Sequence, residues 1–201
     1  SLSRSQHQVH GMAEVVNIVA STRFAADIDL HELADHIGIT FEPEQFPGMI
    51  WKMKEHPVAD GDPPMPKATI LTFASGRSVV VGARKIEDAE EAFNIMRGHL
   101  VEGGFTIWPN DHEVLIKNLV VVDHLNREDL DLKMLSVTLP FTHTEYEPEQ
   151  FPGLIYRQDV NDSQAVCLVF SSGKCVITGC SCIEDAELAA QRLRELLETM
   201  A

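Results

Sequence analysis

Two groups of residues in this sequence have side chains of types that can bind a ligand, and those of the first group are metal-binding types. His31-Glu32-Leu33-Ala34-Asp35-His36 resembles a zinc-protease motif. Its two histidines are five positions apart, however, which places them about 140° apart around a helix rather than on one face. We therefore expect no metal site from this segment.

The cysteines are the other candidate metal ligands. They contain no paired Cys-x-x-Cys motif, and free cysteine commonly packs as a small buried side chain, so we expect core residues. The sequence also shows no phosphate-binding glycine loop and no nucleophile with a base partner, so we predict neither an enzyme nor a cofactor. The cysteines are Cys167, Cys175, Cys180 and Cys182.

The second group consists of aromatic and amide side chains at matched positions. Phe46 and Phe151 belong to a seven-residue motif, Glu-Pro-Glu-Gln-Phe-Pro-Gly, that occurs twice. Phe73 and Phe170 each precede a short Ser-Gly segment. A phenylalanine beside a turn is usually a core residue, but two matched residues in each half favour a functional role.

These matches belong to a duplication that fills the chain. Asn17 in Val-Val-Asn-Ile-Val matches Asn118, and Ile-Glu-Asp-Ala-Glu starts at both Ile86 and Ile183. A repeat of this kind predicts two similar half-domains. We expect a tail over residues 1–13, one repeat over 14–105 and a second over 106–201. The first half carries a longer loop near residues 55–66, where Pro and Gly interrupt strand pairing.

Each half is predicted to contain a short helix, several strands and a long closing helix. Apolar alternation predicts strands at Glu14–Ser21 and Ile116–Asp123. Helical spacing of apolar residues predicts helices at Leu30–His36, from Ile86 onward and from Ile183 to the C-terminus. Further strands are expected in the first half, at Met49–Lys54, Thr69–Phe73 and Ser78–Arg84.

Composition limits the class of protein. The chain has 201 residues, of which 44% are hydrophobic and 23% charged, as in ordinary globular proteins. No apolar run is long enough to span a membrane and no signal peptide is evident. With the reduced cysteines, this predicts a cytoplasmic protein, or a nuclear one in a eukaryote. The net charge of −15 argues, taken alone, against a nucleic-acid partner.

The strands carry bulky apolar side chains on both faces. Helices on one face of an antiparallel sheet would leave the other face open. An exposed apolar face needs an apolar partner, and the bases of a DNA minor groove can provide one.

The chain resembles the TATA-box-binding protein family from about Glu14 to the C-terminus. The shared motifs are Val-Val-Asn-Ile-Val-Ala, Phe-Pro-Gly-Leu-Ile-Tyr-Arg, Leu-Val-Phe-Ser-Ser-Gly-Lys and Val-Ile-Thr-Gly, in family order. The resemblance implies an α+β fold in which two pseudo-symmetric repeats form one curved antiparallel sheet, a saddle, with helices on the convex face. This family is itself a standard example of minor-groove binding by inserted apolar wedges.

The resemblance assigns DNA-facing roles residue by residue. It implies that Phe46, Phe73, Phe151 and Phe170 insert between base steps. It implies that Asn17, Asn118 and Thr178 contact bases, where amides can donate to adenine N3 and thymine O2. Val81 stands where the family has a second threonine. The apolar floor against the groove would comprise Val19, Leu71, Val79, Val81, Val120, Val122, Leu168 and Val176.

Phosphate contacts are also implied by the resemblance, with Ser181 departing from the family's lysine. Residues 46–85 and 151–182 together contain eight Lys/Arg and five Asp/Glu. This leaves +3 on the sheet segments and −18 elsewhere. The acidity is therefore expected on helices and loops that face away from DNA. The implied phosphate contacts are Lys52, Ser75, Arg77, Arg84, Arg157, Ser172 and Lys174.

The implied function is a general transcription initiation factor that binds and bends A·T-rich promoter DNA. Glu147, Glu149 and Gln150 would contact transcription factor B, which with RNA polymerase completes the expected partners. The near-identical copies of the acidic motif and the acidic helix after the first repeat favour an archaeal protein. Two alternatives stay open: a TBP-like paralogue that acts as a regulator or protein-interaction module with weakened DNA binding, and an enzyme that uses this fold to grip substrate. A homodimer of the free protein is also left open.

Overall fold

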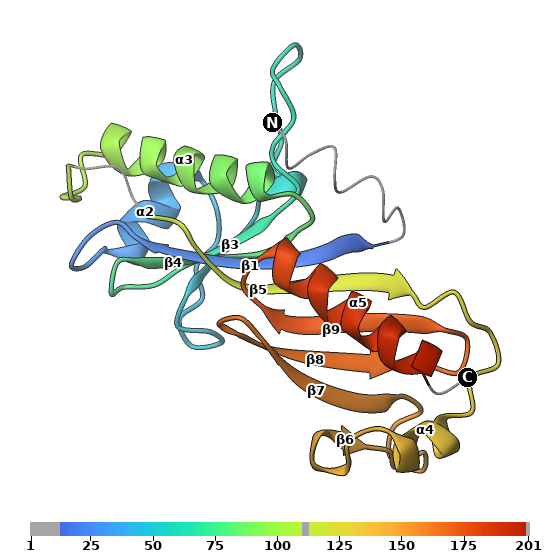
Figure 1. Cartoon of the computed structure of the whole chain (residues 1–201). Helices are drawn as coiled ribbons and strands as arrows, with labels where there is room; N and C mark the ends of the chain where they lie inside the picture. The colour runs from blue at the N-terminus through green and yellow to red at the C-terminus, as the bar shows by residue number, and fades with distance from the viewer. Residues whose placement is uncertain (1–12, 110–112, 200–201) are drawn as a thin grey trace. The chain divides into compact units, whose positions relative to one another are not determined.

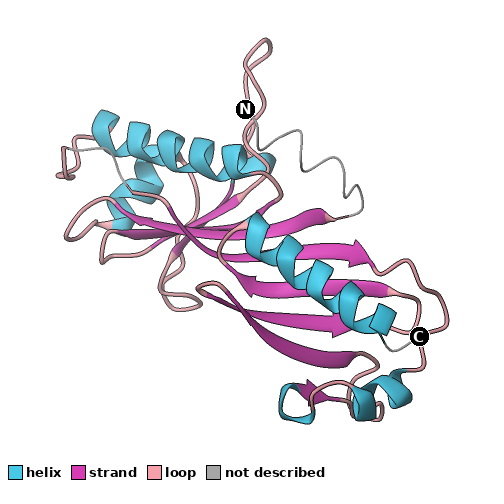
Figure 2. Ribbon diagram, in the orientation of Figure 1, coloured by secondary structure: helices cyan, strands magenta, loops and turns pink. Residues whose placement is uncertain are grey.

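The structure is a computed structural model that describes residues 13–109 and 113–199. Most of the tail expected before residue 14 therefore lies outside the described residues. Two compact units are present: residues 17–117 form one, and the residues described on either side of that segment belong to the other. Each unit consists of an antiparallel sheet with helices (Figures 1 and 2), so the predicted α+β class is confirmed.

The first unit follows the order strand, helix, three strands, helix. Its strands pair in the order β2-β3-β4-β1, and all of these pairings are antiparallel. The strand predicted at Met49–Lys54 is too long: a 3₁₀ turn replaces its last residues, where Met53 is fully buried. The elements are β1 (Glu14–Arg23), α2 (Leu30–Ile37), β2 (Met49–Lys52), η1 (Met53–Glu55), β3 (Thr69–Thr72), β4 (Arg77–Ala83) and α3 (Ile86–Glu102).

The second unit repeats this plan. Its strands pair antiparallel in the order β5-β9-β8-β7-β6. The elements are β5 (Leu115–His124), α4 (Leu132–Thr138), η2 (Phe141–His143), β6 (Thr144–Glu145), β7 (Leu154–Val160), β8 (Ser163–Val169), β9 (Lys174–Cys180) and α5 (Ile183–Thr199). The four main strands and both helices of the first unit thus recur, and η2 and β6 are additions in the second unit.

One face of each sheet is buried beneath its long helix. In the first unit, α3 packs on β4, and its Phe93 and Met96 are fully buried with Ile70 and Val80 of the sheet. In the second unit, α5 packs on β8 and β9. Burying these apolar side chains is the main favourable term that holds each helix to its sheet. The opposite face is left without a helix of its own unit.

The short helices begin at capping residues in both halves. Asp29 accepts a hydrogen bond from the backbone N–H of Glu32 at 3.1 Å, and Asp131 accepts from Met134 at 3.0 Å. An aspartate at this position satisfies an N–H that the first turn leaves unpaired. The α2 helix ends at Gly38, whose φ of 85° is the left-handed conformation that suits glycine.

The two halves differ at the connection between β2 and β3 in the first and between β7 and β8 in the second. The first half has the longer loop after η1, whereas the second has a tight turn at Asn161, whose φ is 52°. Asn161 and Ser163 each donate a side-chain hydrogen bond to the carboxylate of Asp185, at 2.8 and 2.6 Å. Asp185 is buried at the start of α5, so this pair of bonds ties the turn to the helix.

We predict that Asp185→Ala destabilises the protein by about 2 kcal/mol, because it leaves two donors without their charged acceptor. Urea unfolding followed by circular dichroism measures this. Hydrogen bonds from Ser163 and Asn161 lower the pKa of Asp185. The pKa of Asp185 is therefore lower in the folded than in the unfolded protein. Its carboxylate stabilises the folded protein at pH values above the unfolded pKa, and this contribution is lost as the pH falls below about 4.

The repeat supplies a control for this prediction. Asp88 occupies the matched position in α3 and faces no comparable tight turn. Asp88→Ala should change the free energy of unfolding by only about 0.5 kcal/mol. Equal losses in the two variants would show that the Asp185 hydrogen bonds do not stabilise the turn.

No helix among the described residues is long and apolar enough to cross a membrane.

Candidate nucleic-acid interface

The face of the first sheet that α3 does not cover is half-exposed and apolar. Asn17 and Val19 on β1 alternate with the buried Ile18 and Ala20. On the next strands, Leu71 of β3 pairs directly with Val79 of β4, and Thr69 pairs with Val81. The structure therefore brings together on one face the side chains that the family resemblance placed against the groove. The predicted floor residues of this half are Val19, Leu71, Val79 and Val81, all of intermediate exposure.

The second sheet has an equivalent face. Val122 of β5 and Leu168 of β8 are both cross-strand neighbours of Val176 on β9. Thr178 follows two residues later on the same face. Residues between them, such as Ile177, are fully buried. The predicted floor residues of this half are Val120, Val122, Leu168 and Val176, again all of intermediate exposure.

The two predicted amides sit at matched irregularities of the sheets. The register shifts next to Ile18 in β1 and next to Leu119 in β5. The side-chain oxygen of Asn17 accepts a hydrogen bond from Gly82 N–H at 2.8 Å, and Asn118 accepts from Gly179 N–H at 2.8 Å. Since the backbone holds each amide oxygen, the NH₂ group remains as the donor available to a ligand.

The environments of these amides differ in one hydroxyl. Thr178 Oγ1 lies 3.1 Å from Nδ2 and 3.2 Å from Oδ1 of Asn118. Val81 occupies the matched position in the first half, so Asn17 Nδ2 has no hydrogen-bond partner within residues 13–109 and 113–199. The two halves therefore present chemically different donors at matched positions.

The four predicted phenylalanines form two edge-to-face pairs. The ring centroids of Phe46 and Phe73 are 6.0 Å apart, and those of Phe151 and Phe170 are 5.9 Å apart. Such T-shaped pairs are favourable because the positive edge of one ring faces the negative face of the other. Phe46 is 37% exposed, and the other three rings have intermediate exposure.

The glycine of each Phe-Pro-Gly motif makes room for a ring pair. A Cβ at Gly48 would lie 2.9 Å from both Phe46 and Phe73. A Cβ at Gly153 would lie 2.8 Å from Phe151 and 3.1 Å from Phe170. Three of these four distances are below 3.0 Å and the fourth is tight, so a Cβ at either glycine would force the rings to shift. The duplicated motif thus encodes the aromatic pair together with the space that it occupies.

The acidic residues of the same motif form equivalent exposed turns. Gln45 and Phe46 both donate backbone hydrogen bonds to Glu42, each at 3.1 Å. Gln150 and Phe151 donate to Glu147 in the same way, at 2.9 and 3.0 Å. Glu147, Glu149 and Gln150 are exposed, as a contact surface for a protein partner requires.

All the predicted phosphate-contact residues are exposed. Arg77 and Lys174 follow matched turns, in which their carbonyl oxygens accept from Phe73 N–H and Phe170 N–H. Arg157 also pairs with Glu145 at 3.4 Å, with both side chains at least half exposed, so this ion pair is weak. The full set is Lys52, Ser75, Arg77, Arg84, Arg157, Ser172 and Lys174.

A groove in the first unit collects further lysines that the sequence did not single out. It has a volume of about 650 Å³. Lys54, Lys67 and Lys85 line it together with Lys52 and Arg84. Three acidic residues also line it, Glu55, Asp88 and Glu91. The lysines were not predicted as contacts because they lie outside the duplicated motifs.

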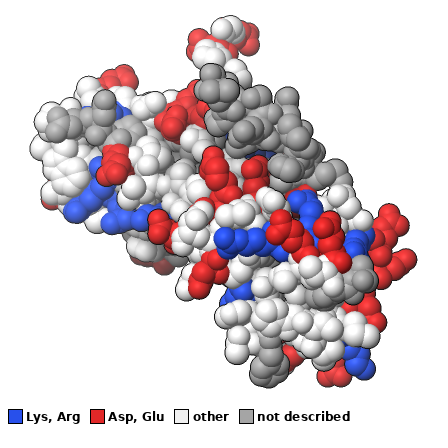
Figure 3. All heavy atoms as spheres, in the orientation of Figure 1, with Lys and Arg blue, Asp and Glu red and all other residues white. Residues whose placement is uncertain are grey.

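The charge on the helices is of the opposite sign. The acidic side chains of α3 include Glu87 in its first turn, followed by Glu90 and Glu91. All three are exposed. Figure 3 shows acidic side chains over the region of α3, with mixed signs over α5. The helices therefore carry much of the negative charge, as the sequence analysis expected.

Three of the four cysteines are core residues, as predicted. Cys167, Cys175 and Cys180 are buried, and Cys182 is half-buried. Burial raises the pKa of the Cys180 thiol to about 11, which keeps it protonated and unreactive at neutral pH.

Comparison with known proteins gives consistent matches along the chain. The profile described as transcription factor TFIID (or TATA-binding protein, TBP) matches residues 12–102 and 113–200. A TATA-box-binding protein of Archaeoglobus fulgidus is 38% identical over 93% of this chain and 95% of its own length. One from Methanococcus maripaludis is 40% identical over 93% of this chain and 94% of its own length.

A solved structure agrees with the sequence matches. The structure of Methanococcus jannaschii TBP superposes with a TM-score of 0.76 at 35% identity, and the match covers 94% of this chain and 99% of that one. Members of this family are non-enzymatic, DNA-binding transcription factors of initiation. The relatives named here are all archaeal. This chain therefore belongs to the TATA-binding protein family.

Proposed function

We propose that this protein is a general transcription initiation factor that binds the minor groove of A·T-rich promoter DNA and bends it. The observation that carries the proposal is the uncovered face of each sheet. Both faces combine an apolar floor, an amide whose oxygen accepts from a glycine N–H, and an aromatic pair at matched positions. The apolar floor and the phenylalanine rings suit a widened minor groove in which base steps are partly unstacked and expose apolar surface.

The amides set the base preference. In the minor groove an A·T pair presents only acceptors, adenine N3 and thymine O2, whereas a G·C pair adds the guanine NH₂ donor. The side-chain oxygens of Asn17 and Asn118 each accept from a glycine N–H, and both NH₂ groups carry N–H donors, one of which can bond to Thr178 in the second half. Donors facing a groove of acceptors favour A·T, and they would face an unmatched donor at G·C.

The difference between the halves supports a preferred direction of binding. Thr178 adds a hydroxyl beside Asn118, and Val81 adds only methyl groups beside Asn17. Arg84 and Ser181 likewise differ in charge at matched positions. Because the minor-groove pattern hardly distinguishes A·T from T·A, such differences in the protein become the source of direction.

The aromatic pairs supply the bend. Phe46 is the most exposed of the four rings and the other three are half-exposed, so a ring edge of each pair can meet a base step. Inserting that edge costs the stacking energy of one step and replaces it with apolar contact, so the duplex kinks where the pair enters. Two pairs would therefore give two kinks.

Basic residues beside the floor neutralise phosphates, while the remaining acidity opposes association. The candidates Lys52, Arg77, Arg84, Arg157 and Lys174 are all exposed. If all five contact phosphates, the logarithm of the binding constant should fall against that of the salt concentration with a slope of about −4.5. The net charge of −15 lowers the association rate but does not prevent short-range contacts.

The exposed turn at Glu147, Glu149 and Gln150 is the proposed contact for transcription factor B, which then recruits RNA polymerase. Its backbone forms a hydrogen-bonded turn, and all three side chains are exposed among the residues that the structure describes.

In the absence of DNA, the uncovered apolar faces of the sheets could pair with a second copy of the protein, because exposed apolar surface favours association. The protein acts inside the cell, where its DNA is.

Binding to labelled duplexes tests the proposal. Fluorescence anisotropy over a salt series should show tighter binding to an A·T-rich duplex than to a G·C duplex of equal length, by about 1000-fold. Transcription factor B should add a slower-migrating complex in a gel shift. Equal affinity for the two duplexes at all salt concentrations would rule the proposal out.

A second candidate, a TBP-like paralogue with weakened DNA binding, is favoured by Val81, Ser181 and the acidic charge. A paralogue of that kind would bind transcription factor B or another protein without forming the A·T-specific complex. Run-off transcription with purified polymerase separates the two, since only a general factor supports initiation.

A further inference from the structure

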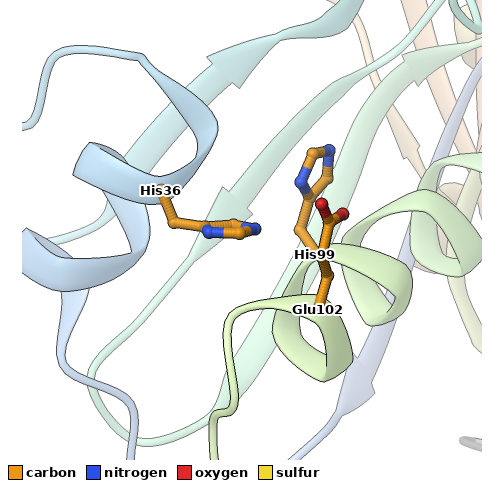
Figure 4. Close-up of side chains that lie close together, drawn as sticks. All are labelled: His36, His99 and Glu102. Carbon is orange, nitrogen blue, oxygen red and sulfur yellow. The ribbon is translucent and has the colours of Figure 1, made fainter.

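Two helices of the first unit bring three potential metal ligands together, away from the uncovered sheet face. His36 lies in the last turn of α2, and His99 and Glu102 lie in the last turn of α3. One donor atom from each of the three lies within 4.8 Å of the other two. Figure 4 shows the ring of His36 pointing from α2 toward the two side chains of α3.

The packing of α2 against α3 fixes this arrangement. Leu33, Ala34 and Ile37 of α2 are buried, as are Met96 and Leu100 of α3. His99 and Glu102 are three positions apart on a helix, so their side chains lie on the same face. The cluster is therefore held by the core on either side of it.

One ring nitrogen of His99 is buried without a hydrogen-bond partner among the described residues. The atom is Nδ1. A buried polar atom without a partner is uncommon and calls for an explanation, such as an ion.

An aromatic wall holds His99 in place. The ring centroid of Trp51 lies 5.4 Å from that of His99 and 5.3 Å from that of His56. Trp51 is buried and donates its indole N–H to His56 Nδ1 at 3.2 Å. His99 is thus the fixed ligand, while the exposed His36 and Glu102 are free to adjust.

We propose that His36, His99 and Glu102 bind a divalent transition-metal ion of the Zn²⁺ class. Two imidazoles and one carboxylate are a common three-residue set for such an ion, with water as the fourth ligand. Mg²⁺ and Ca²⁺ prefer all-oxygen sites, so nitrogen ligands select against them. Ligand atoms around tetrahedral Zn²⁺ are about 3.3 Å apart, which small rotations of His36 and Glu102 reach from the observed spacing.

The duplication shows that the fold does not need this cluster. Because Ile86 and Ile183 start the two copies of the long helix, Leu196 and Thr199 occupy the positions of His99 and Glu102 in α5. Neither can ligate a metal as an imidazole or a carboxylate would. The ligands are therefore an addition to the first half, and the ion would join the ends of α2 and α3 and stabilise that half.

Calorimetric titration of the metal-free full chain with ZnCl₂ tests the proposal. Wild type should bind one ion at this site, and His36→Gln, His99→Gln and Glu102→Gln should each weaken binding by about 100-fold. His36 and Glu102 are exposed, so their variants test the site even where His99→Gln impairs folding. Metal binding should also raise the unfolding temperature of wild type.

His31→Gln is the matched control, since His31 lies on the same helix but outside the cluster, with its ring 4.9 Å from Phe41. It should bind Zn²⁺ as tightly as wild type. Substituted Co²⁺ should give visible d–d bands without the thiolate charge-transfer band that cysteine ligation would produce. The proposal is overturned if wild type binds no Zn²⁺, if the ligand variants bind like wild type, or if the Co²⁺ spectrum shows thiolate ligation.

Discussion

Replacing Phe151 and Phe170 together by alanine should lower the affinity for A·T-rich duplex by about 100-fold and abolish the bend at one end of the site. Each ring that contacts a base contributes on the order of 1–3 kcal/mol, and the inserted pair also offsets the lost stacking of its step. Anisotropy measures the affinity, and energy transfer between dyes at the duplex ends measures the bend. The rings are half-exposed, so the variant should remain folded by circular dichroism.

The matched pair in the first half provides an internal comparison. Phe46→Ala/Phe73→Ala should lose affinity to a similar extent, because its ring geometry is nearly the same. Phe105→Ala, which removes a ring outside the uncovered faces, should leave both affinity and bend unchanged. If either double variant bends the duplex as wild type does, the rings do not insert.

Gly179→Ala should destabilise the protein by about 3 kcal/mol or more. Gly179 has φ of 86°, and a Cβ there would lie 2.3 Å from the carbonyl oxygen of Gln164 on the neighbouring strand. Two costs add: the left-handed backbone, about 1 kcal/mol for alanine, and a clash with backbone that cannot move without breaking the β8–β9 ladder. Denaturant unfolding measures the change.

Gly82→Ala separates those two costs. Gly82 is the matched residue of the first half and has φ of 79°, but a Cβ there meets nothing within 4 Å. It should therefore lose only about 1 kcal/mol. Both glycines donate their N–H to a candidate base-contact amide, so DNA affinity measured on folded protein shows whether the amide orientation survives. Equal destabilisation by the two substitutions would contradict the steric argument.

Most of the fold could be predicted from local patterns. The strand at Glu14–Arg23 and the helices at Leu30–Ile37 and Ile86–Glu102 follow from apolar periodicity, and their copies follow from the duplication. The prediction failed at the end of β2, where alternation continues but burial of Met53 turns the chain into a 3₁₀ segment. Tertiary burial there outweighed the local pattern.

The candidate metal cluster could not be predicted from the sequence. Sequence spacing considered His36 together with His31 and predicted no metal site from that pair, because residues five positions apart lie about 140° apart around a helix. The neighbours of His36 in space are His99 and Glu102, more than sixty positions away in the chain. No local pattern connects them, because only the packing of α2 on α3 brings their side chains together.

The sequence by itself determined that this protein is duplicated and where most of the strands and long helices lie. These properties depend on periodicity and on repeated motifs, both of which are local. Only the tertiary structure decided how the side chains of the uncovered faces are oriented. The ring pairs require space at Gly48 and Gly153, and the amides require a glycine N–H from a neighbouring strand. Such contacts join residues distant in the chain, so their geometry exists only once the sheet has formed.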